Sequence, residues 1–181
     1  MSSVPRTAWS ISAVMLLAMG GGMAAQSPDI EMGIDAAVNI IIPDDGENTT
    51  TVDVPFSRFR FGNYVSDKTL VELGLGFNMI DTPTETASAG RGEISVSYHF
   101  TGDASRARAF LLVGGGGRFV HIDDDTTGQG FGLGGLGVKV PIRRAVGIRF
   151  EVDYLRGFET DFFEATHEIR FLIGTSFFLG N

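Results

Sequence analysis

The stretch GIRFEVDY, Gly147–Tyr154, alternates apolar and charged side chains residue by residue. Successive side chains of an extended chain point to opposite faces. One face would carry Ile148, Phe150, Val152 and Tyr154, and the other Arg149, Glu151 and Asp153. In a soluble β-barrel or sandwich the apolar face points inward, whereas in a membrane barrel it meets lipid. The fold depends on which face is inside.

The first 25 residues differ in composition from the rest of the chain. Arg6 precedes the apolar run WSISAVMLLAM (Trp9–Met19), and the small residues GGGMAA follow. This order predicts a secretory signal peptide, residues 1–25, cleaved after Ala24 or Ala25. The apolar run is too short for a helix that spans a bilayer. Residues 26–181 then form one mature domain.

Charge and cysteine content narrow the class of protein. The chain of 181 residues has a formal net charge of −8 and no cysteine. An acidic chain is poorly suited to nucleic acid, whose phosphates require Lys and Arg, so we expect no nucleic-acid partner. An exported chain without cysteine has no disulfide and depends on packing and hydrogen bonds for its stability.

Period-2 alternation recurs along the whole mature chain and predicts eight strands. The predicted strands are Ile30–Ile42, Thr50–Tyr64, Thr69–Ile80, Ala89–Phe100, Ala107–Ile122, Gly130–Ile142, a seventh containing Gly147–Tyr154, and Phe163–Leu179. A phase change predicts a one-residue bulge near Ser57, and another predicts a slip near Gly134. The glycines at 114–117 leave the faces of the fifth strand unassigned.

Strand length and number favour the membrane alternative. Most predicted strands exceed the roughly five or six residues of soluble strands and reach the roughly nine to eleven of a tilted membrane strand. Closure removes sheet edges that lipid cannot hydrogen-bond. We therefore predict an all-β fold, an eight-stranded antiparallel up-and-down transmembrane β-barrel, with the apolar face of GIRFEVDY toward lipid. A secreted soluble barrel with its apolar face inside is the alternative.

The polar faces predict a luminal charge network. Its members are Glu31, Asp35, Arg58, Arg60, Glu72, Glu93, Lys139, Arg149, Glu151, Asp153, Glu168 and Arg170. Such charges either line a permeation path or proton relay, or form salt bridges that plug the barrel. Buried charges require partners, and eight strands leave little room for continuous water, so we favour the plug.

Aromatic residues predict girdles at both ends of the barrel, as in membrane barrels. With both termini in the periplasm, the inner girdle would contain Phe59, Phe61, Tyr64, Tyr98, Phe100 and Phe177. The outer girdle would contain Phe131, Tyr154, Phe158, Phe162 and Phe163.

Three segments carry a resemblance to a known family. GLGVKVPIRRAVGIRFEVDY (Gly135–Tyr154) and ARAFLLVGGGGRFV (Ala107–Val120) resemble strands of the OmpA-like and OmpX-like outer-membrane β-barrel proteins. IGTSFFL resembles their C-terminal assembly signal, with Gly174, Phe177 and Leu179 in the matching positions. The resemblance implies a monomer in the bacterial outer membrane. Its partners would be outer-membrane lipid, lipopolysaccharide and, during insertion, the barrel-assembly machinery.

Motifs for other chemistry are weak. GLGGLG (Gly132–Gly137) matches a dinucleotide fingerprint, but an extended segment and Pro141 follow where a helix is needed. His99, His121 and His167 are candidate general bases without an evident nucleophile, and the acidic loops at 44–47 and 123–125 lack calcium-site spacing. We expect no catalytic residue, no metal and no cofactor.

The sequence thus predicts an outer-membrane barrel with a role in envelope structure or surface contacts. A narrow pore for small solutes or ions is the first alternative. A lipid-modifying enzyme at the outer rim is the second.

Overall fold

The computed structural model describes residues 30–43, 49–81, 86–101, 106–122, 125–143, 145–160 and 164–179, with side chains left out at 43, 49–57, 78–81, 86–87, 122 and 125. The predicted signal peptide lies outside these ranges. Within them, no helix is long and apolar enough to cross a bilayer.

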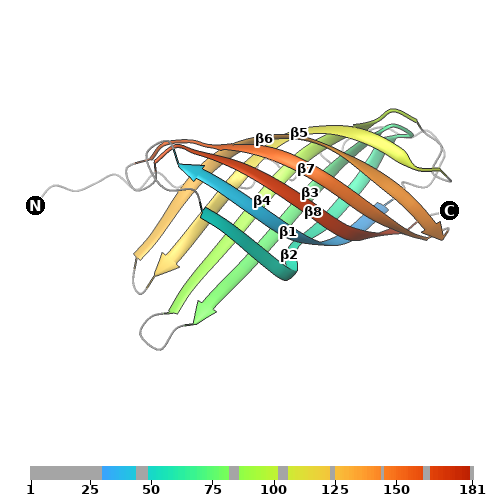
Figure 1. The fold of residues 1–181 in the computed structure, drawn as a ribbon. Coiled ribbons are helices and arrows are strands. Elements are labelled where there is room, and N and C mark those ends of the chain that lie inside the picture. The colour runs from blue at the N-terminus through green and yellow to red at the C-terminus, as the bar shows by residue number, and fades with distance from the viewer. Residues whose placement is uncertain are drawn as a thin grey trace, which may run out of the picture.

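Eight antiparallel strands form one closed barrel (Figure 1). Every strand pairs with its neighbours in the sequence, and β1 pairs with β8 to close the sheet. The strands are β1 (Ile30–Pro43), β2 (Thr49–Ser66), β3 (Thr69–Asp81), β4 (Thr86–His99), β5 (Arg108–Ile122), β6 (Asp125–Arg143), β7 (Val146–Gly157) and β8 (Thr166–Leu179). The predicted fold class and strand number are confirmed.

The faces of β7 answer the question that GIRFEVDY poses. Arg149 and Asp153 are each 1% exposed, whereas Phe150 on the same strand is 44% exposed. The charged face therefore points into the barrel and the apolar face points out. A soluble barrel with its apolar face inside is excluded by this arrangement.

The two ends of the barrel differ in the parts of the chain that meet there. Ile30, the first residue of β1, pairs with Leu179, the last residue of β8, so both strands have their outermost residues at one end. We call this the terminal end; β2, β4 and β6 end there and β3, β5 and β7 begin there. The opposite end, where β1, β3, β5 and β7 end, is the far end.

Two predicted phase changes turn out differently. Near Ser57 the shift is larger than one residue, because Asp35 pairs with Arg58 while Ala37 pairs with Asp53. Near Gly134 there is no shift, because β6 keeps a continuous register with both of its neighbours there.

The continuous register of β6 corrects one predicted girdle residue, and the side chain of Tyr64 corrects another. Phe131 shares the inward face with Lys139 and is only 4% exposed, so it belongs to the barrel interior. The Tyr64 hydroxyl hydrogen-bonds Glu31 inside the barrel, so this ring is luminal as well. Phe59, Phe61, Tyr98, Phe100, Phe177, Tyr154 and Phe158 are exposed, and Phe162 and Phe163 lie outside the described residues.

Candidate functional site: a charged lumen

The structure places all twelve residues of the predicted luminal network inside the barrel, buried and ion-paired. They alternate with apolar residues along β1, β2, β3, β4, β6, β7 and β8, and the pleat directs them all to the same side. The strands thus bring together charges that lie more than a hundred residues apart, as in the 2.6 Å pair of Lys139 with Glu31.

Arg58 is the centre of the network. Its guanidinium donates to Asp35 on β1 at 2.8 Å, to Glu93 on β4 at 2.7 Å and to Glu151 on β7 at 2.8 Å. These three strands are not neighbours in the barrel, so one side chain bridges separate parts of the wall across the lumen. The planar guanidinium, with five N–H groups in a fixed fork, suits this role better than an ammonium group.

Three further cations extend the network around Arg58. Each of them pairs with carboxylates from two strands. Arg60 binds Glu31, Asp35 and Glu72; Arg149 binds Glu72 and Glu151; Arg170 binds Glu93 and Asp153. Shared carboxylates therefore link all four arginines into one hydrogen-bonded unit. In such a unit the loss of one charge leaves its partners buried and unpaired.

Glycines in the lumen make room for these side chains. A Cβ atom on Gly33 would overlap the Arg60 guanidinium, and one on Gly174 would overlap the Asp35 carboxylate. Gly137 leaves space in the same way for the Phe110 ring. The glycines that resembled a dinucleotide fingerprint thus lie on an extended strand, and two of them, Gly135 beside the Asp153 carboxylate and Gly137 beside the Phe110 ring, make room for luminal side chains.

An apolar cluster fills the lumen between β5, β6 and β7. It consists of Phe110, Leu112, Phe131, Leu133 and Leu155. Cations cap its rings: the Arg149 Cζ lies 4.6 Å from the centre of the Phe110 ring, and the Arg91 Cζ lies 5.2 Å from that of Phe131. Sequence analysis left the face of β5 unassigned and therefore missed Phe110 and Leu112, two of the five members of this cluster.

Polar residues that the sequence analysis missed complete both ends of the network. Toward the far end, Arg91 and Arg118 both bind Glu168, and Gln129 accepts from Arg118. Arg91 lies within the predicted strand Ala89–Phe100 and is in phase with Glu93, so the alternation of that strand could have found it. Toward the terminal end, Ser176 donates to Glu31 at 2.7 Å, and Tyr64 does so at 2.9 Å.

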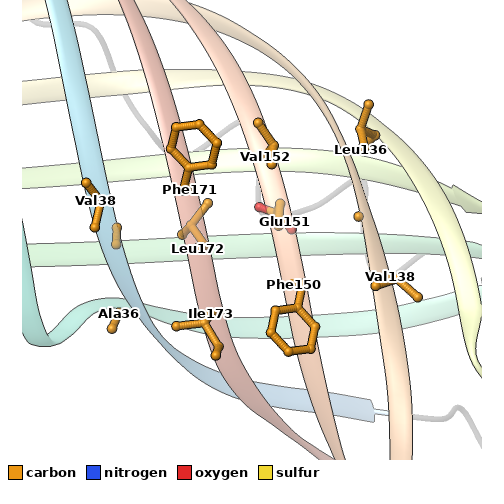
Figure 2. Close-up of a pocket in the computed structure, with 12 residues that line it drawn as sticks. Ala36, Val38, Leu136, Val138, Phe150, Glu151, Val152, Phe171, Leu172 and Ile173 are labelled. Atoms are coloured by element: carbon orange, nitrogen blue, oxygen red, sulfur yellow. The ribbon is translucent and has the colours of Figure 1, made fainter.

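The outward-facing side of the barrel is apolar and includes a hollow. The hollow has a volume of about 560 Å³ and lies over β1, β8, β7 and β6. Figure 2 shows Ile173 between Ala36 and Phe150 there, with Phe171 nearer to Val38. Such a surface is far more apolar than the exterior of a soluble monomer, where large apolar patches are rare.

Each of the three histidines makes a polar contact with a neighbouring residue. His121 hydrogen-bonds Thr126 through Nδ1 at 2.8 Å, and His167 contacts Tyr154 and Arg156. His99 is fully buried, and its Nδ1 donates to the Lys68 carbonyl at 3.2 Å. Residues 44–47, 123 and 124 of the acidic loops lie outside the described ranges. Within the described ranges, no group of three or more metal-ligating side chains occurs.

Comparisons with known proteins agree on architecture. No family model and no curated protein sequence matches the chain. Among solved structures, Neisserial surface protein A matches with a TM-score of 0.62 and 15% identity, over 82% of this chain and 96% of its own. Ail, the attachment invasion locus protein of Yersinia pestis, matches with a TM-score of 0.56 and 8% identity, over 84% and 99%.

A third structural match is the outer membrane enzyme PagL, with a TM-score of 0.51 and 13% identity, over 78% of this chain and 97% of its own. Proteins with different functions therefore share this architecture. At these sequence identities, the similarity to this chain concerns the fold alone. The chain has the fold of the small eight-stranded outer-membrane β-barrels.

Proposed function

We propose that the protein is a monomeric barrel of the bacterial outer membrane, with its terminal end toward the periplasm and a sealed lumen. Its role is then structural, in envelope integrity or surface contacts, and involves no transport. One observation supports a lumen that is closed to water: Arg58 binds carboxylates of β1, β4 and β7 and so crosses the interior. The apolar cluster of β5, β6 and β7 removes further space for water.

The outward face supports the membrane location. Large apolar side chains are exposed on every strand, among them Phe77 and Val113 at 63% and 66%. In water this surface would drive aggregation, whereas in a bilayer it meets acyl chains. The hollow over β1, β8, β7 and β6 is apolar and suits lipid acyl chains. The partners of the protein are then outer-membrane lipid and lipopolysaccharide.

Assembly requires a signal near the end of the chain. Phe177 and Leu179 are exposed on the outward face of β8 at the terminal end. Gly174 lies on the inward face, where the absence of a side chain leaves space for the Asp35 carboxylate. We propose that these outward side chains are read by the barrel-assembly machinery. The proposal assigns no catalytic role to His99, His121 or His167, the candidate general bases.

The test combines location and conductance. Cells expressing the full chain are fractionated, and the membrane fraction is run on gels with and without boiling. The barrel is then reconstituted in planar bilayers, with a variant carrying Arg58→Ser and Phe110→Ala as the matched comparison. We expect outer-membrane recovery, heat-modifiable migration, no steady conductance for the natural chain, and measurable conductance for the variant. Steady channel openings of the natural chain would favour the narrow pore instead, and recovery as a soluble protein would exclude the membrane location.

A further inference from the structure

Arg108 also points into the lumen. Unlike the arginines of the luminal network, it pairs with no carboxylate among the described residues. It is 4% exposed, and its guanidinium donates one hydrogen bond, to the Tyr64 hydroxyl at 3.0 Å. Its Cζ also lies 5.3 Å from the centre of the Tyr64 ring. Four of its five N–H groups have no protein acceptor within the described chain. The Nε and Nη1 atoms are not fully buried, so an anion can reach them from the mouth of the lumen.

The surroundings of Arg108 carry an excess of positive charge. Lys139 is its direct partner in the register between β5 and β6, and both side chains point inward. Like charges opposite each other on neighbouring strands repel. The nearby carboxylate, Glu31, already accepts from Lys139, Arg60, Tyr64 and Ser176. Glu31 is therefore saturated and offers nothing to Arg108.

His99 adds a second unsatisfied group beside the same tyrosine. Its ring centre lies 5.5 Å from that of Tyr64, and in the register of β4 and β5 it is the diagonal neighbour of Arg108. Because Nδ1 donates to the Lys68 carbonyl, Nε2 is left as an acceptor, and it has no hydrogen-bond partner. Ser97 Oγ, two residues away on the same face, is buried without a partner as well.

A ligand for this place must offer oxygen acceptors to a guanidinium and a hydrogen to an imidazole nitrogen. Hydrogen phosphate and phosphate monoesters in their protonated form do both, whereas sulfate at neutral pH has no hydrogen to donate. Arg108 is the first residue of β5, so the position lies just inside the terminal mouth. We propose that Arg108 and His99 form a binding site for a protonated oxyanion of the phosphate class at the terminal mouth of the lumen.

The test compares two probes on the folded full-length barrel in uncharged detergent. Inorganic phosphate and sulfate are titrated at matched ionic strength, with calorimetry and the ¹⁵N signal of His99 Nε2 as readouts. We expect saturable phosphate binding that moves the His99 signal. We also expect about tenfold weaker sulfate binding, the difference that one hydrogen bond allows. A natural chain that binds neither inorganic phosphate nor a phosphomonoester carried on a lipid overturns the proposal.

Variants assign the site. R108Q is expected to abolish binding of both anions, and H99F is expected to lower phosphate affinity to the level of sulfate. R143Q, at an exposed position of the same end of the barrel, is the matched control and should bind phosphate as the natural chain does. Phosphate binding that survives in R108Q would overturn the assignment. The His99 signal in the natural chain keeps the test decisive where H99F does not fold.

A lipid headgroup and free phosphate share this chemistry and are separated by a second arm. Bicelles containing phosphatidic acid, with no free phosphate, present the phosphomonoester on a lipid. Movement of the His99 signal in these bicelles alone would identify a headgroup as the source, and movement with inorganic phosphate would identify a free anion. Movement in neither condition overturns the proposal.

Discussion

The Nη2 atom of Arg58 lies 2.8 Å from Glu151 Oε1, which joins β2 to β7 across the interior of the barrel. Both side chains are almost fully buried, and each has further ionic partners. Pairs of this kind contribute little net stability over an apolar core, but the loss of one partner is costly. The network is therefore most sensitive to single substitutions at its shared members.

Arg58→Met tests this sensitivity. The substitution keeps much of the side-chain volume but leaves Asp35, Glu93 and Glu151 without a common cation. We expect the free energy of unfolding to fall by about 3–5 kcal/mol, the usual cost of breaking a buried ion pair. Urea titration of the refolded barrel measures it. Arg143→Met, at an exposed position, is the control and should change the value by less than about 0.5 kcal/mol. Equal effects of the two variants would contradict the central role of Arg58.

Gly33→Ala tests the close packing against the wall. A methyl group there would overlap the Arg60 guanidinium, which has no free space to move into because it is fully buried. We expect destabilisation of about 1–3 kcal/mol from overpacking. Gly92→Ala is the matched control, since the nearest atom to its Cβ would be 3.9 Å away. The fraction of heat-modifiable barrel after refolding compares the two, and a neutral Gly33→Ala would show that Arg60 can relocate.

Val113→Arg tests the lipid-facing side. Val113 is 66% exposed on the outward face of β5, away from either end of the strand. In a bilayer the substitution should cost about 2–4 kcal/mol, as for a cation near the midplane of a membrane barrel. Unfolding in lipid vesicles provides the measurement, with Val113→Leu as the neutral comparison. A negligible cost for Val113→Arg would mean that water surrounds this face.

Leu155→Ala tests the apolar cluster in the lumen. Leu155 is 1% exposed and packs among Phe110, Leu112, Phe131 and Leu133, so truncation leaves a cavity. We expect a loss of about 2–5 kcal/mol in the free energy of unfolding. Leu136→Ala on the outward face of β6, where lipid can fill the space, is expected to cost clearly less. A reversed order would place the packed core of the protein outside the barrel.

Alternation in the sequence was enough to predict the strands and the direction of most charged side chains, as Glu31, Glu93 and Arg149 illustrate. It was not enough where glycine removes the pattern. The run at 114–117 hid the inward face of β5 and with it Phe110 and Arg108. On β6 the glycines at 134 and 135 allowed either phase, and packing beneath Arg91 keeps Phe131 inside.

The pairings themselves lay beyond sequence reasoning. Which carboxylate meets Arg58 depends on the stagger of eight strands and on distances across the lumen, and neither quantity is encoded in local periodicity. Tyr64 is a related case, because an aromatic ring with a hydroxyl suits both a lipid interface and a polar interior. Its hydrogen bonds to Glu31 and Lys139 show that the interior prevails here.

The bond from Ser176 to Glu31 joins positions 145 residues apart and has a consequence for the order of folding. Glu31 lies on the first strand and Ser176 on the last, so this part of the interior stays incomplete until the two edges meet. A half-formed sheet would leave charges that pair across the lumen, such as Arg58 and Glu151, without each other. Because loop closure over the whole chain must precede these contacts, we expect slow, highly cooperative folding with closure as its final step.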